Sequence, residues 1–459
     1  MADKESMSDK ILKVLETISG HVWGIPLLVL IVGTGIYLTV RIGFLQLRLL
    51  PYSLKLAFSF KQDKNSEGDI SHFQALMTAL AATVGTGNIV GVATAVVFGG
   101  PGAVLWMWLS AFFGMATKYA EAILAVKYRV IDEKGEMSGG PMYYLERGLK
   151  QKWLGVLFAI FGAIAAFGIG NLVQSNAVSN VVNTTFHVPP AVTGLVLMIF
   201  AGLAIIGGIK SIGKVTSFFV PFMAVFYVIG GLIVLVMNVQ LIPDAVGIII
   251  SDAFTGKAVA GGAIGAVIRY GVARGVFSNE AGLGSAPIAA AAAKTDMPGR
   301  QALVSMTQVF IDTIIICSIT GITIVMAGLY SDAAIHPGDL TSVSFAHFLG
   351  NTGSIIVALG LLFFASSTII GWSYYGEKCF SYLFKAKVVI YYRVAFVLVV
   401  YIGAVIELKI VWTFSDIMNG LMAIPNLIGL LGLSGVVIHE TRKVIKTIKE
   451  EKAEMKKSV

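Results

Sequence analysis

The stretch Ala81-Ala-Thr-Val-Gly-Thr-Gly-Asn-Ile-Val-Gly91 interrupts a hydrophobic segment that runs from about Phe73 to Phe98. Bilayer-spanning helices normally satisfy every backbone group internally, so a Gly-Thr-Gly-Asn interruption at mid-depth is tolerated only where it lines a cavity or lies within protein. The half-helix beginning near Gly87 would aim unpaired N–H groups at an anion, and the half ending near Val84 would aim carbonyls at a cation. An amino-acid carboxylate and a sodium ion suit such a pair of sites. The small residues could instead serve only close packing between helices.

Composition places the chain among membrane proteins. Of its 459 residues, 56% are hydrophobic and 13% are charged, and the mean hydropathy is +0.82. Only helix bundles and closed barrels span lipid, and the long unbroken apolar runs indicate helices rather than short alternating strands. We therefore expect an all-α polytopic membrane protein. The formal charge of +8 comes mostly from Lys and Arg in short loops between apolar segments, which indicates membrane topology rather than nucleic-acid binding.

Eleven apolar segments are long enough to cross about 30 Å of hydrocarbon. They lie at about 22–40, 72–99, 101–127, 153–182, 190–208, 213–238, 258–292, 300–329, 354–380, 388–407 and 409–437. Residues 5–20 show helical amphipathic spacing and are expected to lie along the membrane surface, and residues 44–60 suit an interfacial helix.

The distribution of basic residues predicts the orientation. If the N-terminus is outside, the external side keeps only five basic residues, namely Lys4, Lys10, Lys13, Lys257 and Lys409. All other basic clusters, including the tail after residue 438, then face the cytoplasm, as the positive-inside rule requires. We therefore expect a multi-pass protein of the plasma membrane with its N-terminus outside and its C-terminus inside.

The ten spans after the first divide into two groups of five, here called core helices 1–5 and 6–10. An odd number of spans in each group gives the halves opposite topology, which is the inverted-repeat arrangement of secondary transporters. The predicted division is residues 1–71 for the N-terminal segment and extra helix, 72–239 and 240–437 for the repeats, and 438–459 for the basic tail. Core helix 6 is also interrupted by polar and Gly residues within Tyr270–Ser285. Paired interruptions at corresponding positions indicate a transport site.

Four motifs resemble those of the alanine or glycine:cation symporters, within the amino acid–polyamine–organocation superfamily. They are Gly99–Gly114, in which Leu105 stands where Phe is expected, Gly139–Tyr144, Phe277–Gly284 and Gly371–Glu377. The resemblance implies the 5+5 inverted-repeat fold of the bacterial leucine transporter with one extra N-terminal helix. It also implies Na⁺-driven uptake of alanine or glycine, with sodium as the coupling ion and a small neutral amino acid as substrate.

The resemblance also implies which part of core helix 1 contacts the substrate. Residues Val84 to Asn88 are similar to the unwound part of that helix in the wider fold, so N–H groups around Thr86 and Gly87 would hold the substrate carboxylate. The implied substrate contacts on this helix are Thr83, Gly85, Thr86, Gly87 and Asn88.

A sodium site between core helices 1 and 8 is implied in the same way. Its oxygen atoms would come from the carbonyls of Ala81, Val84 and Phe364 and the hydroxyls of Ser367 and Thr368, and a competing register pairs Ser366 with Ser367 instead. Hydroxyl and carbonyl oxygens are hard ligands that suit sodium. In some relatives a lysine on core helix 5 replaces this ion, but the corresponding span here has only Lys214, near its cytoplasmic start.

Polar residues in core helix 3 add substrate candidates. Gln174 could bind the substrate ammonium, and Asn171 lies one turn earlier on nearly the same face. Such amides could equally well serve hydrogen bonds between helices. Phe277 and Ser278 in the second interruption are expected to close over the substrate. Three aromatic residues are expected near the substrate side chain, namely Phe167, Phe277 and Trp372.

Two further expectations concern a pair of charges within the membrane and the number of coupled sodium ions. Asp312 on core helix 7 could balance Arg274 beside the site. Asn88 resembles a ligand of a second sodium site, but core helix 7 offers it no clear partner near Thr307 and Asp312, so a single coupled ion is expected.

Other functions remain as alternatives. A proton-coupled amino-acid carrier or exchanger would use the same fold. An ion channel is disfavoured because no filter-like loop is found. An enzyme is disfavoured because the sequence has no paired carboxylates, metal-binding histidine spacing or nucleophile–base arrangement.

Overall fold

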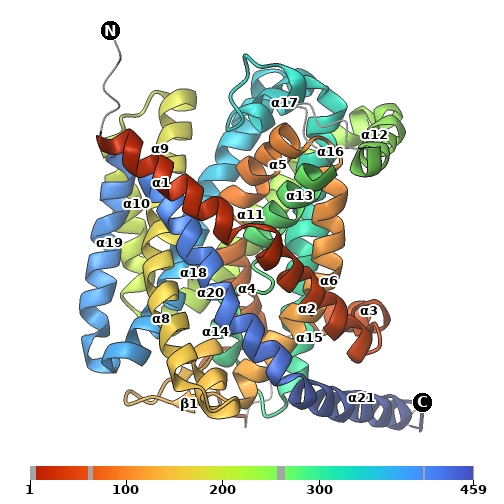
Figure 1. Ribbon diagram of the computed structural model, residues 1–459, viewed down its shortest axis with the longest axis vertical. Coiled ribbons are helices and arrows are strands. Elements are labelled where there is room, and N and C mark those ends of the chain that lie inside the picture. Colours follow the sequence, from red (N-terminus) through yellow and green to blue (C-terminus); the bar gives the residue numbers. More distant parts are fainter. Residues whose placement is uncertain (1–6, 60–65, 256–263, 407–408, 458–459) are drawn as a thin grey trace.

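The computed structural model describes residues 7–59, 66–255, 264–406 and 409–457, and most of them lie in helices (Figure 1). Among these residues, seven helices are long and apolar enough to cross a membrane, or eight if one sharply bent pair counts as a single span. The predicted class of all-α polytopic membrane protein is therefore confirmed. The count of eleven spans stays a prediction. Core helices 4 and 9 have only 16 and 17 residues, and core helix 6 is divided into helices of 16 and 5 residues.

The N-terminal segment forms three helices, α1 Met7–Val22, α2 Ile25–Arg41 and α3 Leu45–Ala57. Trp23, between α1 and α2, donates its indole N–H to the carbonyl of Asp416, at 3.0 Å. Ser19 of α1 donates to the carboxylate of the same residue, at 3.3 Å. The helix expected along the membrane surface is thus anchored to core helix 10.

Core helix 1 is broken where the sequence predicts. Helix α4 His72–Thr83 begins with a capping box between Ser71 and Gln74. A π-helical turn, η1 Gly87–Gly91, follows the break and leads into α5 Val92–Gly99. The two halves are bent by 54°, so the carbonyls at the end of α4 and the N–H groups before η1 are released from regular helical bonds.

The rest of the first repeat contains core helices 2 to 5 and a small hairpin. Its elements are α6 Ala103–Lys127, β1 Val130–Ile131, β2 Met137–Ser138, α7 Pro141–Tyr143, η2 Tyr144–Gly148, α8 Lys152–Phe167, η3 Gly168–Leu172, α9 Val173–Phe186, α10 Pro190–Ile205 and α11 Gly208–Met237. The strands are antiparallel and pair Val130 with Ser138. Core helix 3 consists of α8, the π-helical turn η3 and α9.

The second repeat begins with a surface helix and then repeats the broken first helix. Its elements are η4 Val239–Leu241, α12 Ile242–Thr255, α13 Ile264–Asn279, α14 Pro287–Ala291, α15 Pro298–Val309, η5 Phe310–Cys317, α16 Ser318–Ala327, η6 Leu329–Ser331, α17 Leu340–Leu349, α18 Asn351–Phe384, η7 Ala386–Val388, α19 Val389–Val405 and α20 Lys409–Gly432. Helix α21, Ser434–Lys457, follows as the tail.

Core helix 6 is interrupted between α13 and α14. Glu280, Gly282 and Gly284 have φ angles of 56°, 93° and 85°, in the left-handed region. The helix cannot continue through such angles, and two of the three positions are held by glycine, which adopts them without strain. Both predicted interruptions are therefore present, one in each repeat.

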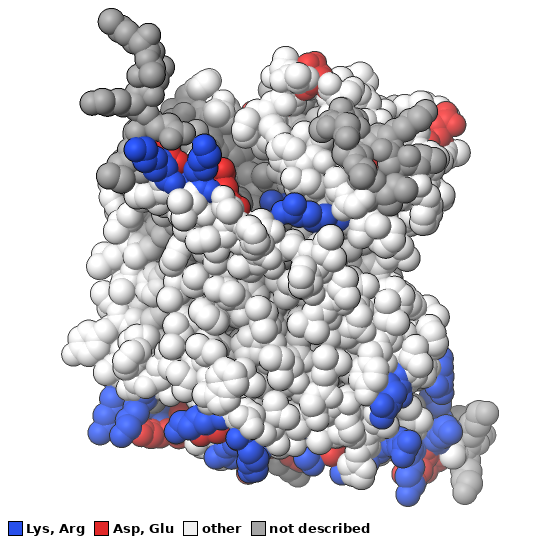
Figure 2. Space-filling view, viewed as in Figure 1, with Lys and Arg blue, Asp and Glu red and all other residues white. Residues whose placement is uncertain are grey.

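The ends of the molecule differ in charge. The beginning of α1 and helix α21 lie at opposite ends of the bundle in Figure 1. Figure 2 shows a broad band with few charges, and most of the Lys and Arg side chains visible on this face gather at the end that carries α21. This asymmetry agrees in direction with the predicted orientation, which remains a prediction.

Candidate functional site

Five oxygen atoms from core helices 1 and 8 converge at the first break. The Ser367 hydroxyl lies 3.1 Å from the carbonyl oxygen of Ala81, 3.4 Å from that of Val84 and 2.8 Å from that of Phe364. The Thr368 hydroxyl lies 3.3 Å from the Val84 oxygen and 3.0 Å from the Phe364 oxygen. All five residues are buried. The structure thus brings together every residue of the predicted sodium set.

The local sequence explains this convergence. Helix α4 ends at Thr83, so its last carbonyls lack intrahelical donors and accept from the hydroxyls of α18 instead. Gly371 allows the close approach of the two helices, because a Cβ there would lie 2.6 Å from the backbone nitrogen of Ala82. Ser366 does not join the cluster, since its hydroxyl donates to Leu362 of its own helix at 2.6 Å. The geometry therefore agrees with Ser367 and Thr368 rather than the competing register.

The N–H groups released by the break meet side-chain amides. The Gly85 N–H donates to the Asn88 side-chain oxygen at 2.9 Å, and the Thr86 N–H donates to the Gln174 side-chain oxygen at 3.3 Å. Gln174 also donates to the Thr86 hydroxyl at 3.1 Å. A carboxylate oxygen of the substrate could take the place of either amide oxygen as the acceptor of these N–H groups. Thr83 is different, because its hydroxyl bonds to Ala79 of its own helix.

A small cavity of about 20 Å³ lies beside these groups, comparable with the space of a single water molecule. Core helices 1, 3, 6, 8 and 10 line it. Eight lining residues belong to the predicted site, namely Thr83, Gly85, Thr86, Gly87, Gln174, Phe277, Thr368 and Trp372, and four were not predicted, namely Ala82, Ile169, Glu280 and Asn419.

Phe167 and Asn171 do not line the cavity, which corrects the sequence-based expectation. The ring of Phe167 packs against Tyr392 and Phe396, with centroids 5.0 and 5.4 Å away. The Asn171 amide donates to the carbonyl of Phe396 at 2.7 Å. The cause is the π-helical turn η3, which widens the helix and changes the angular relation between residues three apart. Asn171 and Gln174 therefore face different neighbours.

Asp312 joins the two interruptions and is not paired with Arg274. Its carboxylate accepts from the Asn88 amide at 2.8 Å and from the Ser278 hydroxyl at 2.9 Å. Arg274 instead lines another pocket together with Asp416, and the opposite charges of the two residues attract each other. The expectations that Asp312 balances Arg274 and that Asn88 has no partner on core helix 7 were therefore wrong. Asp312 lies in the π-helical turn η5, whose altered phase a regular helical pattern does not predict. Ser278 thus contacts Asp312 rather than the cavity.

Glu280 was not assigned to the site, although it was visible as a charge within an apolar span. Glu280 is one of the lining residues of the cavity, and its carboxylate accepts from the Ser285 hydroxyl at 2.6 Å. The ammonium of Lys118 donates to the carbonyl of Glu280 at 3.0 Å and lies 3.6 Å from the Glu121 carboxylate. Glu121 in turn accepts from the Gly282 N–H at 3.0 Å. Core helix 2 therefore holds the second break in place.

A polar cluster connects the hairpin to core helix 8 at the end of the molecule that carries α21. Lys378 of α18 lies 3.1 Å from the carboxylate of Asp132, 3.1 Å from that of Glu136 and 3.1 Å from the hydroxyl of Ser138. Partial burial works to raise the pKa of the Asp132 carboxyl. The Lys378 ammonium and the hairpin N–H groups outweigh that effect and hold the pKa below its usual value of 3.8. The hairpin is thereby fixed to the end of α18.

Comparison with known proteins identifies relatives along nearly the whole chain. The model of the sodium:alanine symporter family matches residues 8–458. A protein named sodium/alanine symporter AgcS, from Methanococcus maripaludis, is 61% identical over 435 residues, which cover 93% of this chain and 96% of that protein. The probable sodium/glutamine symporter GlnT of Bacillus subtilis is 39% identical and covers 90% of this chain and 87% of its own.

Solved structures share the fold at low sequence identity. The crystal structure of MhsT in complex with L-phenylalanine superposes with a TM-score of 0.58 at 14% identity, covering 83% of this chain and 99% of that one. A mutant form of the manganese transporter of Eremococcus coleocola gives a TM-score of 0.50 at 13% identity and covers 82% of each chain. The fold is thus the inverted-repeat architecture of the leucine-transporter type, as expected.

Proposed function

Because the chain belongs to the sodium:alanine symporter family, we propose that it carries small neutral amino acids, alanine and glycine among them, across the plasma membrane together with sodium. Family membership makes the protein a sodium-coupled amino-acid symporter and not an enzyme. The identity of the amino acids, the ion ligands and the orientation of the chain are parts of the proposal.

The main support for the proposal is the cluster of five oxygens at the first break. In the structure the two hydroxyls donate to three carbonyls, so rotation of the O–H bonds would turn hydroxyl lone pairs toward a cation between them. Five uncharged hard oxygens suit Na⁺ and do not suit soft or transition-metal ions. In this account sodium binds to Ala81, Val84, Phe364, Ser367 and Thr368.

The substrate carboxylate binds at the other side of the same break. It replaces the Gln174 amide oxygen as acceptor for the Thr86 N–H, and the partial positive charge at the start of the half-helix favours it. The displaced Gln174 side chain, together with the Glu280 carboxylate, lies along the same cavity and offers oxygens to the substrate ammonium.

The side chains around the cavity favour a small substrate. A Cβ at Gly170 would lie 2.3 Å from the Cβ of Trp372, so the backbone of core helix 3 holds Trp372 in place. Phe277 closes another side of the cavity. A hydrogen atom or methyl group needs little rearrangement there, whereas a leucine or glutamine side chain needs both aromatic residues to move. Glutamine is a necessary comparison because the relative GlnT is named for it.

Transport then follows from alternating access. The repeats 72–239 and 240–437 rock about the site, and sodium stabilises the junction of core helices 1 and 8 in the state that accepts substrate. Sodium and the carboxylate share the two ends of one helix break, so each tightens the binding of the other.

The test is uptake of labelled alanine into proteoliposomes under a sodium, a potassium or a pH gradient. We expect uptake only under the sodium gradient, and competition by glycine but not by leucine or glutamine. Uptake driven by a pH gradient alone would support the proton-coupled alternative and refute the sodium site. Competition by glutamine as strong as that by glycine would refute the small pocket.

A further inference from the structure

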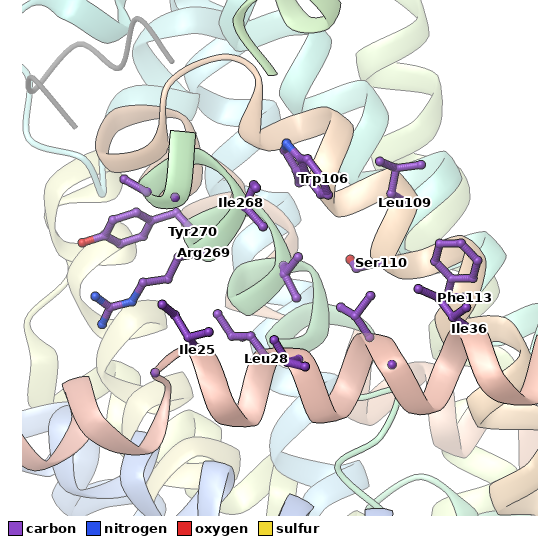
Figure 3. Close-up of a pocket in the computed structure, with 17 residues that line it drawn as sticks. Ile25, Leu28, Ile36, Trp106, Leu109, Ser110, Phe113, Ile268, Arg269 and Tyr270 are labelled. Atoms are coloured by element: carbon purple, nitrogen blue, oxygen red, sulfur yellow. The ribbon is translucent and has the colours of Figure 1, made fainter. Parts of the chain in front are cut away.

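A long apolar groove of about 910 Å³ runs between the extra helix α2 and core helices 2 and 6. Figure 3 shows α2 along one side and α13 with α6 along the other, with Leu28 and Ile36 of α2 facing the groove. The mechanism above uses none of its residues. A groove of this kind on a membrane-embedded surface has to be filled by something apolar.

One cation lies at the end of this groove. In Figure 3, Arg269 and Tyr270 lie at one end, where the Arg269 guanidinium points away from the apolar lining, and Phe113 lies at the other. The guanidinium carbon is 5.9 Å from the Tyr270 ring centroid. The guanidinium also lies near Gly20 of α1, because a Cβ added to Gly20 would be 3.9 Å from the Nη2 atom of Arg269. Arg269 is exposed, and among the described residues it has no carboxylate within 4 Å.

The length of the groove matches one leaflet of a bilayer. Its α2 wall extends from Ile25 to Ile36, and at 1.5 Å per residue this is about 16 Å. The hydrocarbon core of a bilayer is about 30 Å thick, so the acyl chains of one leaflet extend over about half of that distance. A guanidinium at the end of an apolar channel of this length complements a molecule with a phosphate head and one or two acyl chains.

We infer that this groove is a phospholipid-binding site, in which Arg269 holds the phosphate and an acyl chain lies between α2, α6 and α13. The inference depends on neither the substrate nor the ion of transport. The lipid would contact α13, the helix that ends at the second break, and would join the extra N-terminal helix to the moving core.

The structure offers a variant that blocks the groove without a clash. Gly33 lines the groove, is exposed, and has nothing within 4 Å of an added Cβ, so Gly33→Phe places a ring in the channel. Gly247 of α12 is likewise exposed with nothing within 4 Å, so Gly247→Phe is the matched control. Arg269→Gln removes the proposed phosphate partner, and Lys10→Gln on α1 removes an exposed cation elsewhere.

The measurement is native mass spectrometry of delipidated, detergent-purified protein incubated with phosphatidylglycerol or with diacylglycerol of the same chains. Circular dichroism and gel filtration check that each variant is folded. We expect the wild type and both controls to retain one phosphatidylglycerol in preference to diacylglycerol. Gly33→Phe and Arg269→Gln should lower retention at least about tenfold, because charge-assisted bonds and the buried chain both contribute.

Four results would overturn the inference. Wild-type retention by folded Gly33→Phe would show that the chain does not lie in the groove. Equal retention of phosphatidylglycerol and diacylglycerol, or no effect of Arg269→Gln, would show that no phosphate is held. A protein dimer that Gly33→Phe dissociates would show that a second copy of the chain fills the groove.

Discussion

Removal of both hydroxyls from the proposed sodium site, by Ser367→Ala with Thr368→Ala, should weaken sodium binding far more than it weakens folding. The two side chains supply two of the five oxygens at the site. A contact between a polar group and a charge contributes about 1.5–3 kcal/mol, so the pair contributes about 3–6 kcal/mol. Since about 1.4 kcal/mol corresponds to a factor of ten, the sodium concentration for half-maximal activation should rise at least about 100-fold.

The same variant loses hydroxyl donors to the carbonyls of Ala81 and Val84. Each buried carbonyl left without a donor lowers the free energy of unfolding by about 1–3 kcal/mol. We expect the variant to remain folded despite this loss. The assay is alanine uptake into proteoliposomes as a function of external sodium, with thermal unfolding measured in parallel. The matched control is Ser366→Ala, which removes the neighbouring hydroxyl that bonds to Leu362 of its own helix.

We expect the control to keep the sodium dependence of the wild type. Unchanged sodium activation in the double variant would refute the site. An equal loss in Ser366→Ala would show that the effect arises from α18 as a whole and not from the oxygens at the break.

Four other predictions concern residues that support the site and the hairpin. Asp312→Asn keeps the shape of the side chain but replaces one of its two acceptor oxygens by a donor, so the bond from either Ser278 or Asn88 is lost. The rate of alanine uptake should fall at least about tenfold. Wild-type kinetics would contradict the bridging role of Asp312. Gly371→Ala should separate core helices 1 and 8, lower the unfolding free energy by about 1–3 kcal/mol and weaken sodium binding; thermal unfolding and sodium titration test this, and unchanged values would contradict it. Asp132→Asn should loosen the hairpin and raise its hydrogen exchange, by at most about fivefold because Lys378 keeps its ion pair with Glu136. Because the pKa of Asp132 is depressed in the folded protein, its contribution is present above the unfolded pKa and is lost only below it, so protection of the wild-type hairpin, corrected for intrinsic exchange, should not change from pH 8 to pH 5.

The breaks could be predicted from sequence because glycine and polar residues within an apolar span have few structural explanations. The segment from Val84 to Asn88 and the left-handed Gly282 and Gly284 are cases of this kind. The Ser367–Thr368 pair followed from family resemblance together with the regular geometry of α18, an unbroken helix of 34 residues.

The errors arose where the helices depart from regular geometry. Asn171 and Asp312 both lie in π-helical turns, where the spacing of three or four residues no longer marks one face. The role of Glu280 was missed for a related reason. The direction of the Glu280 side chain depends on its left-handed φ angle, directly after the end of α13, and helical periodicity does not describe such an angle.

In the proposed mechanism, one helix break holds both sodium and the substrate carboxylate. The most direct test is titration calorimetry of the purified protein, measuring alanine affinity at several sodium concentrations and sodium affinity with and without alanine. We expect each ligand to tighten the binding of the other by the same factor, about 5- to 150-fold, and we expect this factor to be lost in the Ser367→Ala, Thr368→Ala variant. Alanine affinity that does not change with sodium would contradict this mechanism.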